Sequence, residues 1–224
     1  MKETYSRTKP VWARMNEEER KATMEYGERY KKFLDTARTE RLAVTEILRQ
    51  AEEAGFKPLY DMKELKPGDK VFWNQKGKSV VLAVIGKKPV HDGLKIVGSH
   101  LDSPRLDLKG NPVHESDGVV YFRTHYYGGI KKYQWVTLPL AIHGVVAKTD
   151  GEVVEVNIGE DKNDPVFCVT DLLIHLAGAQ MEKKANKVIE GEELDLLFGS
   201  KPLKGKEKEA VKESVLALLK EKYD

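Results

Sequence analysis

The sequence has a single cysteine and no long hydrophobic run. Cys168 is that one cysteine among 224 residues, so an intrachain disulfide and a zinc finger built from cysteines are excluded. A bound metal would have to use His, Asp and Glu side chains. The longest apolar stretches, 80–86 and 135–147, are shorter than the roughly 20 residues of a membrane-spanning helix. Residues 1–15 are polar and lack the apolar segment of a secretory signal, so we expect a cytoplasmic protein with no membrane partner.

Net charge is also low. The chain has 38 Lys and Arg residues against 36 Asp and Glu residues, which gives +2. Nucleic-acid-binding proteins usually carry a large basic excess, so we expect no nucleic-acid partner. A basic run, Lys201 to Lys208, lacks interleaved aromatic side chains, and we interpret it as a solvated loop. The hydrophobic content of 40% is enough for a buried core, so the composition predicts an ordered globular protein.

Two helices are predicted near the N-terminus. Asn16 followed by Glu19 has the spacing of a capping box, in which each side chain bonds to the other residue's backbone N–H. Apolar residues then recur at helical spacing: Tyr26, Tyr30, Phe33, Leu34 and Ala37. Thr39 is a typical N-cap residue and Gly55 is typical of the position beyond a helix C-terminus, so a second helix is predicted between them.

Short strands are predicted after these helices. Residues 71–73, 79–85 and 95–99 have the pattern of β-strands separated by turns that contain Pro and Gly. The continuous apolar run 80–85 predicts a strand buried on both faces, as in the middle of a mixed sheet that helices cover. The first part of the chain is therefore expected to have an α/β fold.

The sequence pattern changes after Pro104, so we place a domain boundary near residue 103 and expect two domains, 1–103 and 104–224. The second domain is expected to be rich in β-structure, with two helices toward its end. Its predicted strands are 106–109, 119–126, 135–139 and 153–158, and its predicted helices are 170–184 and 206–222.

A His-x-Asp pattern follows the predicted strand 95–99. If the chain continues in an extended conformation, the alternation of side chains points His100 and Asp102 to the same face. A carboxylate in that position fixes the tautomer and ring orientation of a metal-bound histidine. The carboxyl ends of strands are also where open α/β folds place their sites. The pattern is short and occurs by chance in many sequences, so on its own it leaves a metal site and a coincidence both open.

Two longer motifs resemble those of a known family. Residues 98–108 (GSHLDSPRLDL) and 125–135 (HYYGGIKKYQW) resemble the aminopeptidase I/aspartyl aminopeptidase family of zinc metallopeptidases. Residues 39–41 (TER) and 171–176 (DLLIHL) are further matches. The resemblance runs from about residue 20 to the end of the chain, with the motifs in the order in which the family has them.

The resemblance implies a two-zinc exopeptidase that removes N-terminal amino acids from peptides. In this family the histidine of the His-x-Asp motif binds one zinc, a role that falls on His100. The aspartate orients that histidine for catalysis, a role that falls on Asp102. Residues 1–103 would be the N-terminal piece of an α/β/α catalytic domain. Residues 104–224 would be an inserted dimerisation domain, incomplete at its C-terminal end, whose His175 helps to bind substrate in the active site of a second subunit.

The resemblance also implies a homo-oligomer, in which dimers build a larger tetrahedral assembly. Zinc is the metal that the family uses, although His and carboxylate ligands accept cobalt or manganese as well. Whether the enzyme prefers an acidic residue or a neutral or hydrophobic one at the peptide N-terminus stays open.

The sequence departs from the family in length. Complete members are about twice as long, and the resemblance places the remaining zinc ligands and the glutamate general base in their second half. We therefore expect this chain to be the N-terminal half of such an enzyme and to be inactive alone. The alternative is a non-catalytic fragment or assembly module that self-associates through residues 104–224. A complete hydrolase built from local histidines is a third hypothesis, but no His-Glu-x-x-His pattern supports it.

Other acidic residues and histidines have simpler structural interpretations. Glu192 and Glu193 follow a glycine in a charged stretch and predict a solvated turn. Asp107 alternates with leucines, as on the polar face of a strand. His91 is assigned to a turn, and His143 to a hydrogen-bonded position in an apolar run. His114 and His125 are assigned to structural or exposed positions.

Overall fold

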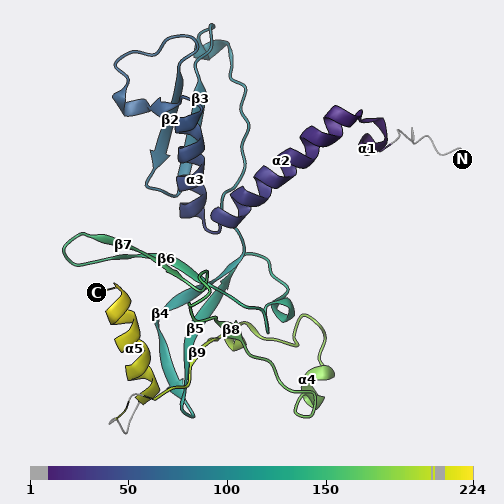
Figure 1. Ribbon diagram of the computed structural model, residues 1–224, viewed down its shortest axis with the longest axis vertical. Coiled ribbons are helices and arrows are strands. Elements are labelled where there is room, and N and C mark those ends of the chain that lie inside the picture. Colours follow the sequence, from purple (N-terminus) through teal and green to yellow (C-terminus); the bar gives the residue numbers. More distant parts are fainter. Residues whose placement is uncertain (1–9, 203, 205–209, 224) are drawn as a thin grey trace, which may run out of the picture. The chain divides into compact units, whose positions relative to one another are not determined.

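The computed structural model describes residues 10–202, 204 and 210–223 and divides the chain into two compact units. Met1–Ser103 is called the N-terminal unit and Pro104–Asp224 the C-terminal unit. Both units contain helices and β-sheet (Figure 1), so the α/β fold class expected from the sequence is confirmed. No helix among the described residues is long and apolar enough to span a bilayer.

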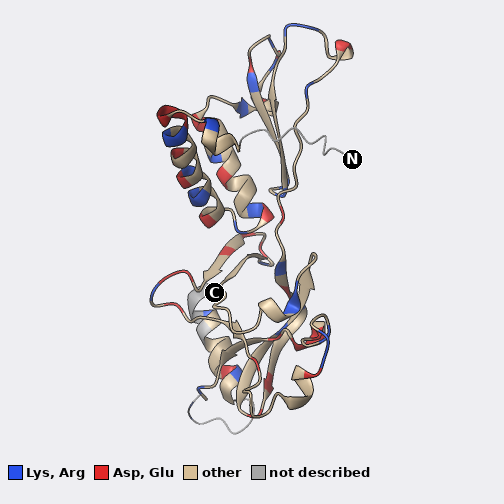
Figure 2. Ribbon diagram, turned by 90° about the vertical axis from the view of Figure 1, so that its right-hand side faces the viewer, with Lys and Arg blue, Asp and Glu red and all other residues tan. Residues whose placement is uncertain are grey.

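Three helices open the N-terminal unit: α1 (Val11–Arg14), α2 (Glu17–Thr36) and α3 (Glu40–Glu53). α2 begins with the predicted capping box, because the Asn16 side chain accepts from the Glu19 N–H at 2.8 Å and the Glu19 carboxylate accepts from the Asn16 N–H at 2.9 Å. Acidic and basic residues are interspersed along the helices of this unit (Figure 2). No residue of α2 is buried; of its predicted apolar stripe, Tyr26, Tyr30 and Leu34 are exposed, whereas Phe33 and Ala37 are half-buried.

The residues at the two termini of α3 explain where the helix begins and ends. The Thr39 hydroxyl caps the helix as predicted and accepts from the Leu42 N–H at 3.3 Å. α3 ends before Gly55, whose φ of +84° lies in the left-handed region that glycine adopts most easily. One face of the helix is buried through Ala43, Val44 and Ala51.

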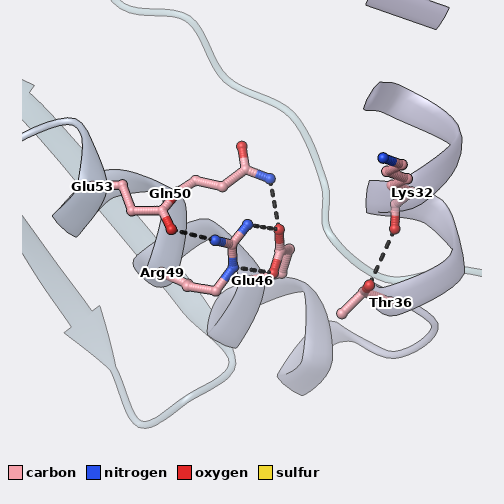
Figure 3. Close-up of polar contacts among 6 residues, drawn as sticks. All are labelled: Lys32, Thr36, Glu46, Arg49, Gln50 and Glu53. Atoms are coloured by element: carbon pink, nitrogen blue, oxygen red, sulfur yellow. Dashed lines mark hydrogen bonds and ion pairs between the residues drawn. The ribbon is translucent and has the colours of Figure 1, made fainter. Parts of the chain in front are cut away.

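A polar network runs along α3 (Figure 3). Arg49 donates to Glu46 through Nε at 2.8 Å and through Nη2 at 2.7 Å, and it donates to Glu53 through Nη1 at 2.6 Å. Gln50 Nε2 also donates to Glu46, at 2.8 Å. Because hydrogen bonds from Arg49 and Gln50 favour the ionised carboxylate, they lower the pKa of Glu46 to about 2.

The sheet of the N-terminal unit has the strand order β1-β2-β3. β1 (Lys57–Pro58) pairs in parallel with β2 (Lys70–Gln75), and β2 pairs antiparallel with β3 (Ser79–Val84). α3 lies against β2 and β3 (Figure 1), and Val71 and Phe72 of β2 are buried.

Two strand predictions for this unit are wrong. The run 80–85 is not buried on both faces, because β3 is an edge strand and its Val81, Leu82 and Val84 are exposed. Residues 95–99 form no strand, and they pair with no other segment in the part of the chain that the structure describes. A strand needs a neighbouring strand to satisfy its backbone N–H and C=O groups. This segment has the composition of a strand, but among the described residues it has no such neighbour.

The C-terminal unit contains a four-stranded sheet and a separate two-stranded hairpin. The sheet has the order β4-β5-β9-β8, and all neighbouring strands are antiparallel. The strands of the sheet are β4 (Arg105–Ser116), β5 (Val119–Tyr127), β8 (Cys168–Val169) and β9 (Leu196–Gly199). The hairpin joins β6 (Ile142–Ala147) to β7 (Val153–Ile158). The predicted strands 106–109, 119–126 and 153–158 are confirmed.

The core of the C-terminal unit lies between the sheet and α5 (Ala210–Tyr223), which Figure 1 shows beside β4. Val211 and Val215 of α5 pack against a cluster of buried residues: Val120, Phe122, Val169, Ile189, Leu194 and Leu196. Glu115 of β4 holds the first turn of α5, because its Oε2 accepts from the Val211 N–H at 3.2 Å and from the Lys212 N–H at 2.9 Å. The helix predicted at 206–222 is thus present from Ala210, and residues 206–209 lie outside the described residues.

Two predictions for this unit are wrong. Residues 135–139 form no strand; a 3-10 turn (Lys132–Gln134) precedes isolated bridges at Val136 and Leu140. The helix predicted at 170–184 is reduced to α4 (Gly178–Met181). Most helical stability in proteins comes from packing one apolar face, and the apolar residues of the preceding loop are exposed: Leu172, Leu173, Ile174 and Leu176.

Candidate functional site

The His-x-Asp motif lies at the C-terminal end of the N-terminal unit. His100 Nδ1 is 2.8 Å from the backbone carbonyl oxygen of Asp102 and 3.3 Å from its carboxylate Oδ1. The expected contact between the two residues is therefore present, although the strand that was expected to bring it about is not. The His100 side chain is 84% exposed, so its ring is open to an incoming ligand.

This contact defines the chemistry of the imidazole. A carbonyl oxygen can only accept a hydrogen bond, so Nδ1 is the protonated nitrogen and it donates to Asp102. In the neutral ring with this tautomer, Nε2 carries the lone pair, which is the form of histidine that binds metals. A histidine whose second ring N–H is held by a backbone carbonyl or a carboxylate is typical of metal sites.

His100 fits zinc as a single ligand. Zinc in proteins is usually held by three or four His, Cys, Asp or Glu side chains. Among residues 10–202, 204 and 210–223, no group of three or more such side chains is placed to hold a metal ion. The donor chemistry therefore agrees with the expected zinc, while the described residues alone do not close a site around it.

His175 lies in an exposed loop of the C-terminal unit. Its neighbours Ile174 and Leu176 are exposed apolar residues. Asp171 shapes the start of the loop, because its Oδ1 accepts from the Leu172 N–H at 2.8 Å and from Gln180 Nε2 at 3.0 Å. The imidazole is thus accessible on a loop that a side-chain hydrogen bond ties to α4.

The remaining histidines have local partners. His143 Nε2 lies 2.9 Å from Glu160 Oε1 and its side chain is largely buried, which confirms a hydrogen-bonded structural role. His91 lies in the 3-10 turn Val90–Asp92, as predicted. His114 stacks on Tyr121 at a centroid distance of 5.6 Å, and His125 is exposed on β5.

The acidic residues that could have joined a site are also occupied locally. Asp107 of β4 accepts from Arg105 Nε at 2.7 Å, in keeping with a polar strand face. Glu192 lies in the 3-10 turn Gly191–Glu193 and forms an ion pair with Lys109. The hydrogen bond from Lys109 lowers the pKa of Glu192, so this carboxylate stays ionised. The predicted solvated turn at Glu192 is confirmed.

The sequence reasoning missed that the two motifs meet in the C-terminal unit. The pairing of β4 with β5 sets Arg105 opposite Tyr127 and Asp107 opposite His125. The Arg105 guanidinium lies 4.1 Å from the centroid of the Tyr127 ring, a cation–π contact. Part of the signal was available, because polar and apolar side chains alternate over residues 105–108 with the period of a strand, but that alternation does not say which strand is the partner.

Comparison with known proteins agrees with the motifs. The family model described as aminopeptidase I zinc metalloprotease (M18) matches residues 33–224. A protein of Clostridium acetobutylicum named as a probable M18 family aminopeptidase 1 is 52% identical, over 96% of this chain and 48% of its own length. The Thermotoga maritima protein of the same name is 44% identical, over 96% of this chain and 46% of its own length.

Solved structures agree as well. The crystal structure of the M18 aminopeptidase from Thermotoga maritima has a TM-score of 0.89 and 42% identity, and the match covers 98% of this chain and 47% of that one. Aminopeptidase I from Clostridium acetobutylicum has a TM-score of 0.83 and 50% identity, over 96% and 48% of the two chains. This chain spans about half the length of the curated relatives it matches. With the family model matched over most of its length and both motifs in place, the chain belongs to the aminopeptidase I zinc metalloprotease family, M18.

Proposed function

We propose that this chain supplies the N-terminal portion of a zinc-dependent aminopeptidase that releases N-terminal amino acids from peptides. The observation that carries the proposal is the His100–Asp102 contact, in which the Nδ1–H donates to Asp102 and Nε2 of an exposed side chain is left for a metal. In this proposal Met1–Ser103 is a portion of the catalytic domain, and the protein acts in the cytoplasm.

The geometry of the two residues supports the role proposed for each. His100 binds one zinc of a two-zinc site through Nε2, and Asp102 is a positioning residue that holds the imidazole in the metal-binding tautomer. Bound zinc would supply Lewis-acid polarisation of the scissile carbonyl and a lowered pKa of bound water. Cobalt or manganese would suit the same donor chemistry.

The C-terminal unit has a proposed role in assembly. We infer that it mediates self-association into dimers, which build a tetrahedral assembly, and that His175 contacts substrate in the active site of a second copy. The exposed position of His175 and its apolar neighbours supports this role, since exposed apolar residues that cluster in one loop favour association.

A chimaera tests the proposed activity. This chain replaces the matched N-terminal portion of the Clostridium acetobutylicum relative, with which it is 52% identical, and hydrolysis of aminoacyl chromogenic substrates is measured with zinc present. We expect activity in the chimaera, loss of activity with His100→Ala and retention with His91→Ala. His91 is a matched control, because it is 81% exposed and lies 3.5 Å from its own neighbour, Asp92.

Full activity of the His100→Ala chimaera would show that this histidine is no ligand and would end the proposal for the site. Loss of activity in both histidine variants would point to a general effect on folding and would equally contradict the assigned role.

An assembly module without catalytic activity is the second candidate function of the chain alone. It is favoured by the lack of a three-ligand group among the described residues. Light scattering on a size-exclusion column tests it, with Leu173→Ser and Leu176→Ser as variants of the exposed loop. A dimer that the variants dissociate supports the module, and a strict monomer at micromolar concentration contradicts it.

A further inference from the structure

We propose that Asp171 and Gln180 are positioning residues, and that the hydrogen bond between their side chains sets where the His175 imidazole is presented to substrate. The inference rests on the proposed function, which gives His175 its contact with substrate. It deepens that function by naming the residues that hold this histidine in place. The residues between β8 and α4, 170–177, are called the His175 loop.

The first observation is that both ends of the His175 loop are held. Val169, which precedes the loop, is buried, pairs with Leu196 of β9, and accepts from the Thr137 N–H through its carbonyl at 2.8 Å. Ala177, the last residue of the loop, is also buried. Residues 170–176 are exposed, so an exposed segment runs between two fixed ends.

The second observation is the backbone around His175. The Leu176 N–H donates to the Leu173 carbonyl at 2.8 Å, and the Ala177 N–H donates to the Ile174 carbonyl at 3.3 Å. The chain therefore makes two overlapping turns, and His175 lies inside both. Because its side chain is exposed, the place of the imidazole depends on the loop backbone rather than on packing.

The third observation is that one carboxylate oxygen closes the loop. Asp171 Oδ1 accepts from the Leu172 N–H at 2.8 Å and from Nε2 of Gln180, a residue of α4, at 3.0 Å. Asp171 precedes the two turns and Gln180 follows them, so their bond links the start of the loop to the helix after it. Hydrogen bonds to a carboxylate are also stronger than those between neutral groups.

These contacts give the closing bond its importance for the imidazole. A segment with few buried contacts opens at low cost in free energy, and residues 170–176 are such a segment. Opening would move His175 away from its place relative to substrate, and misplacement by about 1 Å can cost about 100-fold in rate. The bond between Asp171 and Gln180 opposes this opening.

Steady-state kinetics of the chimaera test the inference. Gln180→Ala and Asp171→Ala should each lower kcat/KM by about tenfold, through the same parameter, kcat or KM, that His175→Ala changes. Asp171→Asn should keep most of the activity, because its amide oxygen still accepts from Gln180. Gln50→Ala is the matched control, since Gln50 Nε2 donates to the Glu46 carboxylate at 2.8 Å in the N-terminal unit, and it should leave kcat/KM unchanged.

A double-mutant cycle separates positioning from a general structural role. If Gln180 acts through His175, Gln180→Ala should change kcat/KM by less than about twofold in the His175→Ala background. Amide hydrogen exchange in the chain itself adds a readout that needs no activity. Gln180→Ala should speed exchange at Leu176 and Ala177 by about two- to tenfold, the factor that a typical hydrogen bond contributes.

Three results would overturn this inference alone: unchanged kcat/KM in Gln180→Ala, unchanged hydrogen exchange, or an effect of Gln180→Ala that is as large in the His175→Ala background as in the parent. Activity that His175→Ala leaves unchanged would remove the proposed role of His175 and this inference with it. An inactive parent chimaera would instead remove the proposed function on which the inference rests.

Discussion

Asp102 holds His100 through two different atoms, and only one of them belongs to its side chain. The carbonyl oxygen accepts from Nδ1 at 2.8 Å, and the carboxylate lies farther away, at 3.3 Å. A substitution at Asp102 therefore removes the negative charge but leaves the carbonyl in place. Substitutions of Asp102 and of His100 are therefore expected to differ in how strongly they weaken zinc binding.

The first prediction concerns zinc affinity in the chimaera. Asp102→Ala should lower the affinity by about tenfold, the low end of the usual cost of losing a partner of a metal-bound histidine, because the carboxylate is lost while the backbone carbonyl still accepts from Nδ1. Asp102→Asn should lower it less, because the amide oxygen still accepts from Nδ1. Zinc titration calorimetry measures both. Equal loss in Asp102→Asn and His100→Ala would contradict a positioning role for Asp102.

The second prediction concerns backbone strain at Thr137. Its φ of 62° is in the left-handed region, where a β-branched residue is a rare outlier. The Thr137 N–H donates to the Val169 carbonyl at 2.8 Å, which holds the residue in place. Thr137→Asn should raise the free energy of unfolding of the C-terminal unit by about 1 kcal/mol, because asparagine tolerates this region. Urea denaturation measures the change, with Thr137→Ala as a control that gains less.

At the scale of elements, the helix ends were predictable because their signals are local. Asn16, Glu19, Thr39 and Gly55 each act within a few residues, and each was found in its predicted place. The segments 95–99 and 170–184 were mispredicted because their apolar pattern indicates that they pack, but it does not identify the element that they pack against. The same limit applied to the site: the His100–Asp102 contact was predictable, and the β4–β5 pairing of the two motifs was not.

The third prediction concerns the attachment of α5. Glu115→Ala removes the acceptor for the Val211 and Lys212 N–H groups and should destabilise the helix by about 1 kcal/mol, as loss of an N-terminal cap does. Faster amide hydrogen exchange in α5 would report it. Glu152→Ala should leave exchange in α5 unchanged, because Glu152 contacts Lys148 near the β6–β7 hairpin. Unchanged exchange in Glu115→Ala would contradict the account.

The fourth prediction concerns acid stability of α3. The pKa of Glu46 is lowered to about 2 from its ordinary 4.5, so its stabilising effect is complete above pH 4.5 and is lost as the pH falls toward 2. Glu46→Gln should therefore lower the melting temperature near neutral pH and flatten its fall within that window. Thermal melts at a series of pH values measure this. Glu53→Gln, which removes the more exposed partner of Arg49, should keep most of the pH dependence.

At the scale of the whole molecule, the two units differ in how much of their apolar surface is buried. The C-terminal unit has a core of buried residues between its sheet and α5. The N-terminal unit carries His100, the proposed zinc ligand, and apolar residues of β3 and of the segment 94–97 are exposed in it. Membership of the M18 family follows from the sequence as a whole, whereas a working metal site needs ligands beyond those that the described residues bring together.

The zinc content of the chimaera is the most direct test of the central claim, that His100 is a zinc ligand of an aminopeptidase. Elemental analysis of the dialysed parent, His100→Ala and His91→Ala chimaeras measures the equivalents bound. The account predicts that His100→Ala loses one zinc equivalent relative to the parent while His91→Ala loses none. Unchanged zinc content in His100→Ala would contradict it.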